Sequence, residues 1–225
     1  MFKTELHVHT HESSPCCDLP TEKIAEKYVT AGYTTMVVTD HYTPALCREC
    51  TDVRARVEGH IAGYRRLAKL LEGRIHVLYG FELRFEGAQN DYLVYGLEPD
   101  FLLGYPDICM LSRRAAIEEI HAMGGMIYQA HPFRNNMTVL DPAGLDGIEI
   151  FNAHNHHDSR NYLAYAFAKQ SGLPGVAGSD LHHSYHSASA GILTPEPITT
   201  QDELIAALRA GTYRTFGEIV PMAQD

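Results

Sequence analysis

The sequence contains no apolar run that approaches the roughly 20 residues needed for a membrane-spanning helix, and it contains no low-complexity tract. Its opening residues, MFKTELHVHT, lack the apolar core and small-residue cleavage site of a secretory signal. With 45% hydrophobic and 20% charged residues in 225 positions, the composition is that of a soluble globular protein. We therefore expect a single domain over residues 1–225, located in the cytoplasm and without membrane contact.

Cysteine is sparse and does not form a disulfide framework. The five cysteines are an odd number, and in a chain without a secretory signal they are expected to be reduced thiols. Cys47 and Cys50 form one CxxC pair, but no second pair is present to complete a structural zinc site. We therefore interpret the cysteines as ordinary free thiols.

Positive charge is also scarce, because 18 Lys and Arg residues face 28 Asp and Glu residues, a formal net charge of −10. Nucleic-acid backbones are bound by clustered Lys and Arg, so this balance disfavours a nucleic-acid partner. It does not exclude a phosphorylated small molecule, because divalent cations held by carboxylates and imidazoles would supply positive charge locally.

Strand-like and helix-like stretches alternate along almost the whole chain. Strands are predicted near residues 3–8, 34–40, 75–80, 91–96, 126–130, 147–151, 174–178 and 213–216. Helices are predicted near residues 21–31, 52–72, 112–123, 159–170 and 200–210. This alternation is typical of α/β folds built on a largely parallel sheet.

Metal-binding side chains recur where these strands end. A strand places residues i and i+2 on one face, so His7 and His9 aim at one point, and Asp180 and His182 repeat that spacing. The other acidic or imidazole side chains at predicted strand ends are Asp40, His41, Glu82 and His131. Mixed imidazole and carboxylate ligands suit Zn, Mn or Fe, and more than four of them imply more than one ion.

The motifs LHVHT, VVTDH, GFEL, QAHP, GIEIFN and GSDLH occur in this order. With them, essentially the whole chain resembles the PHP (polymerase and histidinol phosphatase) family of metal-dependent phosphoesterases. The resemblance implies a distorted (β/α)7 barrel, similar to a TIM barrel, with two or three divalent ions (Zn, Mn or Fe) at its carboxyl mouth. The ligands that it implies are His7, His9, His41, Glu82, His131, Asp180 and His182.

The chain departs from the family pattern in two places. Family members usually carry another Asp or His soon after the HxH motif, whereas this chain has HESSPCCD. His11, Glu12 or Asp18 could serve as that ligand, and Glu12 is preferred because Asp18 lies against a helix start. Many members also have a histidine ahead of the AHP motif, for which Asp91 is either a substitute or a solvated turn residue.

These features predict hydrolysis of a small-molecule phosphate monoester, such as a nucleotide or a sugar or amino-alcohol phosphate. Clustered ions would supply a metal-activated hydroxide and clamp the phosphoryl oxygens. Arg134 and Arg84 are candidate phosphate clamps, or else surface ion pairs. His183, or alternatively His186, is the candidate that protonates the leaving oxygen, unless both are solvated loop residues.

Two other functions remain open. An amidohydrolase-type metal hydrolase also begins with HxH and ends with an Asp, although its usual ligating lysine has no obvious counterpart here. A non-catalytic metal-binding or regulatory module would keep the ligands without turnover. A proofreading nuclease is disfavoured by the acidic balance and by the absence of a basic, aromatic-rich stripe.

Overall fold

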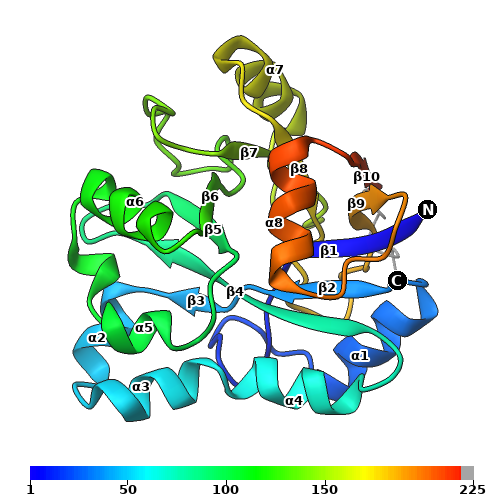
Figure 1. The fold of residues 1–225 in the computed structure, drawn as a ribbon, viewed down its shortest axis with the longest axis horizontal. Coiled ribbons are helices and arrows are strands. Elements are labelled where there is room, and N and C mark those ends of the chain that lie inside the picture. The colour runs from blue at the N-terminus through cyan, green and yellow to red at the C-terminus, as the bar shows by residue number, and fades with distance from the viewer. Residues whose placement is uncertain (219–225) are drawn as a thin grey trace.

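The computed structural model describes residues 1–218, in which a mixed sheet curls into a nearly closed barrel (Figure 1). The strands follow the order β10-β9-β1-β2-β4-β5-β6-β7-β8. Their bounds are β1 Phe2–Val8, β2 Thr35–Val38, β4 His76–Arg84, β5 Asp91–Tyr95, β6 Met126–Gln129, β7 Gly147–Asn152, β8 Gly175–Gly178, β9 Ala190–Thr194 and β10 Arg214–Gly217. The barrel closes where Val8 bridges Leu181, just beyond β8. The predicted α/β barrel is therefore confirmed.

The sheet is not parallel throughout. β1, β2 and β4 run parallel to one another, as do β6, β7 and β8, whereas β5 runs antiparallel to both β4 and β6. No helix separates β4 from β5, because a turn containing Gly87 at φ +70° reverses the chain directly. β9 and β10, of which β9 was not predicted, extend the sheet antiparallel beyond β1, while the short β3 (His41–Tyr42) pairs with β4.

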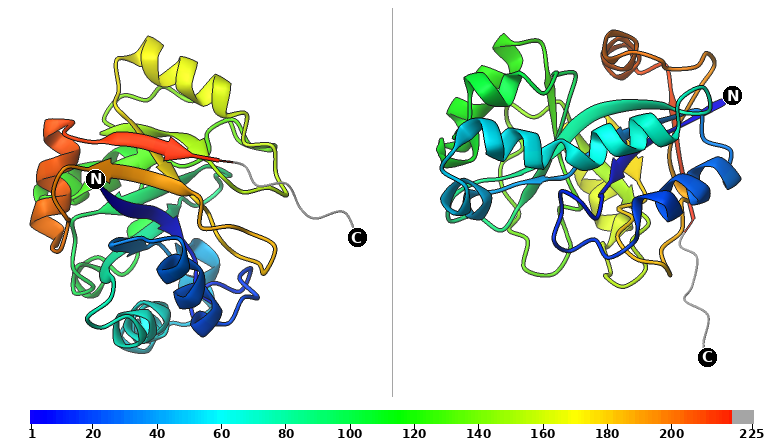
Figure 2. Two further views of the ribbon diagram at one scale, coloured as in Figure 1. Left: turned by 90° about the vertical axis from the view of Figure 1, so that its right-hand side faces the viewer. Right: turned by 90° about the horizontal axis from the view of Figure 1, so that it is seen from below.

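Helices lie around the outside of this sheet (Figures 1 and 2). They are α1 Thr21–Thr30, α2 Pro44–Glu49, α3 Val53–His60, α4 Ala62–Leu70, α5 Phe101–Gly104, α6 Arg113–Ala122, α7 Asn161–Ser171 and α8 Gln201–Ala210, with a 3-10 turn η1 at Ile108–Met110. Ser112 caps α6, and a capping box of Thr200 and Glu203 opens α8, as the sequence indicates. Within residues 1–218, no helix is both long and apolar enough to cross a membrane.

The long helix predicted over residues 52–72 is wrong, because it is two helices that meet at Ile61. Gly63, in the first turn of the second helix, packs against the loop after β1, where an added Cβ would lie only 1.7 Å from Thr10 Oγ1. A straight amphipathic pattern could not reveal this bend, since its cause is contact with a loop distant in sequence.

The barrel interior is apolar over part of its length and ionisable at one end. Leu6, Val37, Leu93 and Val176 belong to an apolar cluster of buried side chains. Near the carboxyl ends of the parallel strands the buried side chains are instead ionisable, and they are His7, His9, Asp40, Glu82, His131, Glu149 and Asp180, each at most 2% exposed. Burial of so many ionisable groups requires that they be paired or bind ions.

Candidate metal centre

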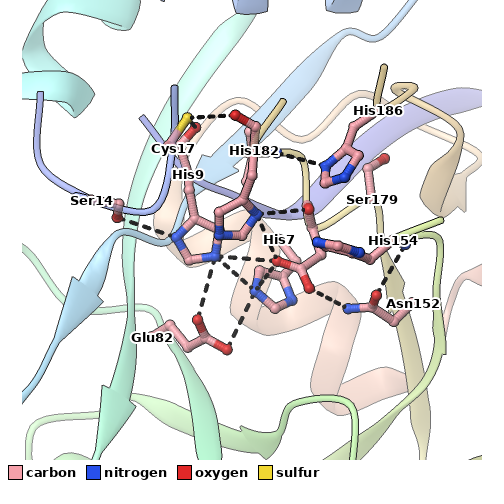
Figure 3. A network of polar contacts seen from close by, with 12 residues as sticks. His7, His9, Ser14, Cys17, Glu82, Asn152, His154, Ser179, His182 and His186 are labelled. Carbon is pink, nitrogen blue, oxygen red and sulfur yellow. Dashed lines mark hydrogen bonds and ion pairs between the residues drawn. The ribbon is translucent and has the colours of Figure 1, made fainter. Parts of the chain in front are cut away.

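The predicted ligands converge at one end of the barrel. His7 is near the end of β1 and His9 just follows it, while His41, His131, Asp180 and His182 follow β2, β6 or β8. Glu82 differs from the prediction because it lies inside β4, which continues to Arg84 through its pairing with β5. The side chains of His7, His9 and Glu82 point toward one another (Figure 3).

Four of these side chains approach one another at distances typical of ligands that share a cation. His7 Nε2 lies 3.1 Å from His9 Nε2, 3.4 Å from Glu82 Oε1 and 3.3 Å from Asp180 Oδ1. His9 Nε2 lies 3.3 Å from Glu82 Oε2 and 3.4 Å from Asp180 Oδ1. Ligands about 2.0–2.1 Å from a tetrahedral ion are separated from one another by about 3.3–3.4 Å. The residues therefore fit a divalent ion.

Glu82 has the geometry of a bridging carboxylate. Its Oε1 lies 3.1 Å from His131 Nε2 as well as near His7, and its Oε2 lies 2.9 Å from His41 Nδ1 as well as near His9. The buried Oε2 atom has no satisfactory hydrogen bond within the described chain. A carboxylate that contacts two pairs of imidazoles is able to bridge two cations.

Glu149, on β7, fixes the orientation of the centre. Its Oε1 lies 2.9 Å from His7 Nδ1, and its Oε2 accepts hydrogen bonds from the His131 amide at 2.8 Å and from Asn152 Nδ2 at 3.0 Å. Because a carboxylate accepts, His7 carries its proton on Nδ1 and leaves Nε2 free to bind a cation. Asn152 also donates to Asp180 Oδ2 at 3.1 Å, so one strand positions ligands from three others.

The buried charges sustain the ionised carboxylates that cations require. Burial would raise the pKa of Glu82, but His7 and His41 outweigh burial and hold that pKa well below its usual range. The pKa of Asp180 is also held well below its usual range, since His7 outweighs burial there. Burial, aided by the positive charges of His182 and His41, holds the pKa of His9 well below its ordinary value and keeps the imidazole neutral.

Two candidate ligands have a strained backbone. His131 adopts φ +25° and Asp180 adopts φ +50°, a region that costs non-glycine residues about 1–3 kcal/mol. The amide of Asp180 donates to the His7 carbonyl at 2.8 Å, and the amide of His131 donates to Glu149. These bonds hold the strained turns that aim both side chains into the barrel.

The residues considered for a further ligand after the HxH motif do not reach the cluster. Glu12, which the sequence favoured, instead bonds to Thr21 Oγ1 and lies 3.2 Å from Arg66 Nε. Asp18 is exposed and lies 2.9 Å from His183 Nδ1. His11 Nδ1 contacts the Cys17 carbonyl at 2.9 Å, because the loop after β1 turns these side chains outward.

A cavity of about 480 Å³ opens over the centre. The side chains that line it include Cys16, His41, Glu82, Arg84, Asp91, His131, Arg134, His154, Asp180, His182 and His183. Both arginines are held by acids, Arg84 by two bonds of 2.7 and 2.8 Å to Asp91 and Arg134 by a bond to Asp180. Asp91 is thus engaged by an arginine, although one of its oxygens also lies within 4.8 Å of ligand atoms of His41 and Glu82.

Sequence reasoning missed three supporting residues. Glu149 and Asn152 lie in the GIEIFN segment, and Ser14 Oγ lies 3.3 Å from His9 Nδ1 while donating to Asp40 at 2.6 Å. An acidic residue inside an apolar strand was the signal that identified Glu82, and the same signal was present for Glu149. No comparable signal marks Ser14, because serine is common in loops.

Comparisons with known proteins agree with this architecture. Residues 158–213 match the family model described as PHP-associated. A 76-residue stretch is 42% identical to a 5'-3' exoribonuclease of Haemophilus influenzae, which covers 30% of this chain and 27% of that relative.

Two solved structures share the fold over most of the chain. A two-domain protein of Bacteroides vulgatus, containing a predicted PHP-like metal-dependent phosphoesterase, matches with a TM-score of 0.68 at 13% identity, over 96% of this chain and 64% of that chain. A lesion-specific endonuclease of Pyrococcus furiosus matches with a TM-score of 0.62 at 14% identity, over 95% and 57%. The chain thus spans less than two thirds of each of these relatives. The family-model match over residues 158–213 and the shared barrel fold support the predicted resemblance to the PHP domain family.

Proposed function

We propose that the chain is a metal-dependent phosphoesterase that hydrolyses phosphate monoesters of small molecules, using two or three divalent ions (Zn, Mn or Fe). The observation that carries this proposal is that one cavity contains both a candidate cation site and an arginine with an unused hydrogen-bond donor. The cluster of His7, His9, Glu82 and Asp180 lies beside Arg134, whose buried Nε has no hydrogen-bond partner among the described residues. Cations and a guanidinium are the groups that bind a phosphoryl group.

Arg134 is positioned to bind a phosphoryl oxygen. Its Nη2 donates to Asn152 Oδ1 at 3.0 Å and to Asp180, so the guanidinium is held in place while Nε remains available. A guanidinium fixed before substrate arrives loses little entropy on binding. Arg84, held in a similar way by Asp91 at the rim, is the second cation that a phosphate would meet.

His183 is the proposed general acid. Its imidazole lines the cavity, and its Nδ1 lies 2.9 Å from Asp18 Oδ1, close enough for an ion pair when the ring is protonated. The neighbouring His154 is less suited to this role. Its Nδ1 accepts from the amides of His156 and His157, both at 3.3 Å, and burial lowers its pKa to about 2, so it is a neutral donor.

When bound, the divalent ions would lower the pKa of a water molecule and neutralise charge that develops on the phosphoryl group. The protein's own residues then have separate tasks. Glu149 fixes the proton of His7 on Nδ1, Arg134 orients the phosphoryl group, and His183 gives a proton to the leaving oxygen.

A nuclease is the second candidate function. The named activity of the Haemophilus influenzae relative, 42% identical over 76 residues, favours it. The cavity volume of about 480 Å³ lies in the range of small-molecule sites, which are about 300–1,000 Å³, and accommodates a single nucleotide or sugar phosphate. An amidohydrolase is less well supported, because no lysine lines this cavity in the part of the chain described.

The test is a substrate panel for protein loaded with Mn or Zn. We expect hydrolysis of p-nitrophenyl phosphate and of nucleotide or sugar phosphates, with little cleavage of a 5'-phosphorylated oligoribonucleotide. Cleavage of the oligonucleotide alone would favour the nuclease. Bound metal without turnover of any substrate would favour the regulatory module.

Two variants sharpen this panel. Glu82→Gln should reduce bound metal and activity together, since it removes a bridging charge. His183→Asn should reduce kcat for alkyl phosphates by about a hundredfold or more, and less for p-nitrophenyl phosphate, whose leaving group needs no proton. Equal losses for both substrates would remove His183 from the role of general acid.

A further inference from the structure

Cys16 is an exposed cysteine beside two candidate ligands. Its side chain lines the cavity over the centre, in the same wall as the imidazoles of His41 and His182. The expectation of an ordinary free thiol does not account for this position. A thiol that shares a cavity wall with two imidazoles has the composition of a metal site.

The backbone holds Cys16 in this place. The Cys17 thiol donates to the His182 carbonyl at 3.2 Å, and the amides of Asp18 and Leu19 donate to the same oxygen, also at 3.2 Å. Figure 3 shows the Cys17 sulfur directed at this carbonyl. Three bonds therefore join the loop after β1 to the loop after β8, and Cys16 cannot move far from His182 without breaking them.

The two imidazoles are oriented as ligands. His182 Nδ1 lies 2.9 Å from the Asp180 carbonyl, which can only accept, so Nδ1 carries the proton and Nε2 presents a lone pair. His41 Nδ1 lies 2.9 Å from Glu82 Oε2 without a hydrogen bond among the described residues, so this imidazole also has a nitrogen available to a cation. Ligand atoms of both residues and of His9 lie within 4.8 Å of one another, but His9 Nε2 already lies close to His7, Glu82 and Asp180.

We propose that Cys16 supplies a thiolate ligand, together with His41 and His182, to one ion of this centre. The inference rests on the metal centre of the proposed function and not on its substrate. The thiol proton passes to solvent as the sulfur–metal bond forms. Because thiolate is a soft ligand, this position should prefer Zn over Mn, whereas the site of His7, His9, Glu82 and Asp180 offers only nitrogen and oxygen.

The test is the absorption spectrum of the protein loaded with Co²⁺. A thiolate ligand produces an intense near-ultraviolet charge-transfer band, whereas nitrogen and oxygen ligands give only weak visible bands. We expect this band in the wild type and in Cys50→Ser, a control that removes a cysteine away from the centre, and we expect its loss in Cys16→Ser. Zinc content should fall by one ion per chain in Cys16→Ser only.

A band that persists in Cys16→Ser would overturn the inference. So would Co²⁺ binding by the wild type with visible bands alone, an outcome that leaves the metal centre and the proposed hydrolysis intact. X-ray absorption of the zinc-loaded wild type needs no variant, and it should show a sulfur neighbour at about 2.3 Å. Failure of the substrate panel would count against the proposed function while leaving the sulfur ligand unaffected.

Discussion

Glu149 illustrates how the role of a single residue depends on its neighbours. As one carboxylate in an apolar strand, it could have bound an ion directly or formed a salt bridge. Instead it contacts His7 Nδ1 at 2.9 Å and the amide of His131 at 2.8 Å, and it therefore orients ligands. This distinction requires the register of β7 beside β6, which the amino-acid pattern does not contain.

His60 should make the protein sensitive to acid. This histidine is 2% exposed, neither ring nitrogen has a hydrogen-bond partner in residues 1–218, and burial with the positive charge of His41 lowers its pKa to about 3. Because the unfolded chain takes up this proton near pH 6.5, the free energy of unfolding should fall as the pH drops below 6.5, by about 1.4 kcal/mol per unit.

The measurement is urea denaturation of the wild type and of His60→Leu between pH 7.5 and 5. The variant lacks the titrating ring, so from pH 6.5 to 5 it should gain about 2 kcal/mol relative to the wild type. Both proteins carry the same metal centre, so its titration cancels in the difference. If the free energies of unfolding of the two proteins changed with pH in the same way, His60 would not cause the acid sensitivity.

At the scale of the element, Gly178 sets the distance between β8 and β1. A Cβ at this position would lie 2.3 Å from His7 Cβ and 3.0 Å from Glu149 Oε1. Gly178→Ala should therefore displace His7, weaken metal binding and cost about 1–3 kcal/mol of stability. Metal content and thermal unfolding measure the two effects.

Gly59→Ala is the matched control for that substitution. Gly59 lies in α3 with nothing within 4 Å of an added Cβ, so the change should leave metal content intact and stabilise the helix by up to about 1 kcal/mol. If both variants lost metal equally, the metal loss in Gly178→Ala could not be attributed to the close approach of β8 and β1.

The sequence predicted some elements well and others poorly, for identifiable reasons. Caps and apolar periodicity are local, so α6, with its Ser112 cap, and α8, with its capping box, began where expected. The antiparallel direction of β5 and the division of the predicted long helix at Ile61 depend on contacts between distant segments. The convergence of candidate ligands at strand ends was predictable from where apolar runs stop, whereas the position of Glu12 was not, because the path of a loop has no periodicity.

At the scale of the whole molecule, the centre exists only when the barrel is complete. Its residues come from β1 and β4 and from the turns after β2, β6 and β8, so the unfolded chain offers no equivalent site. Metal should therefore stabilise the native state, by about 2.7 kcal/mol at a concentration a hundred times Kd.

That linkage predicts a melting temperature about 5–10 °C lower after chelation, given a shift of about 2–4 °C per kcal/mol for a protein of this size. Differential scanning fluorimetry with chelator, and again after Zn or Mn is restored, measures it. Identical melting temperatures in both states would contradict a centre formed by the folded barrel.

The closure of the barrel at Val8 and Leu181 has a consequence for the order of synthesis. His7 and Asp180 join at this closure, although about 170 residues separate them in the chain. At about 5–20 residues per second, the ribosome needs roughly 9–35 seconds to make that interval. During this time His7 and His9 are exposed without Asp180. The complete ligand set therefore forms only after residue 182 has been made, when the barrel can close.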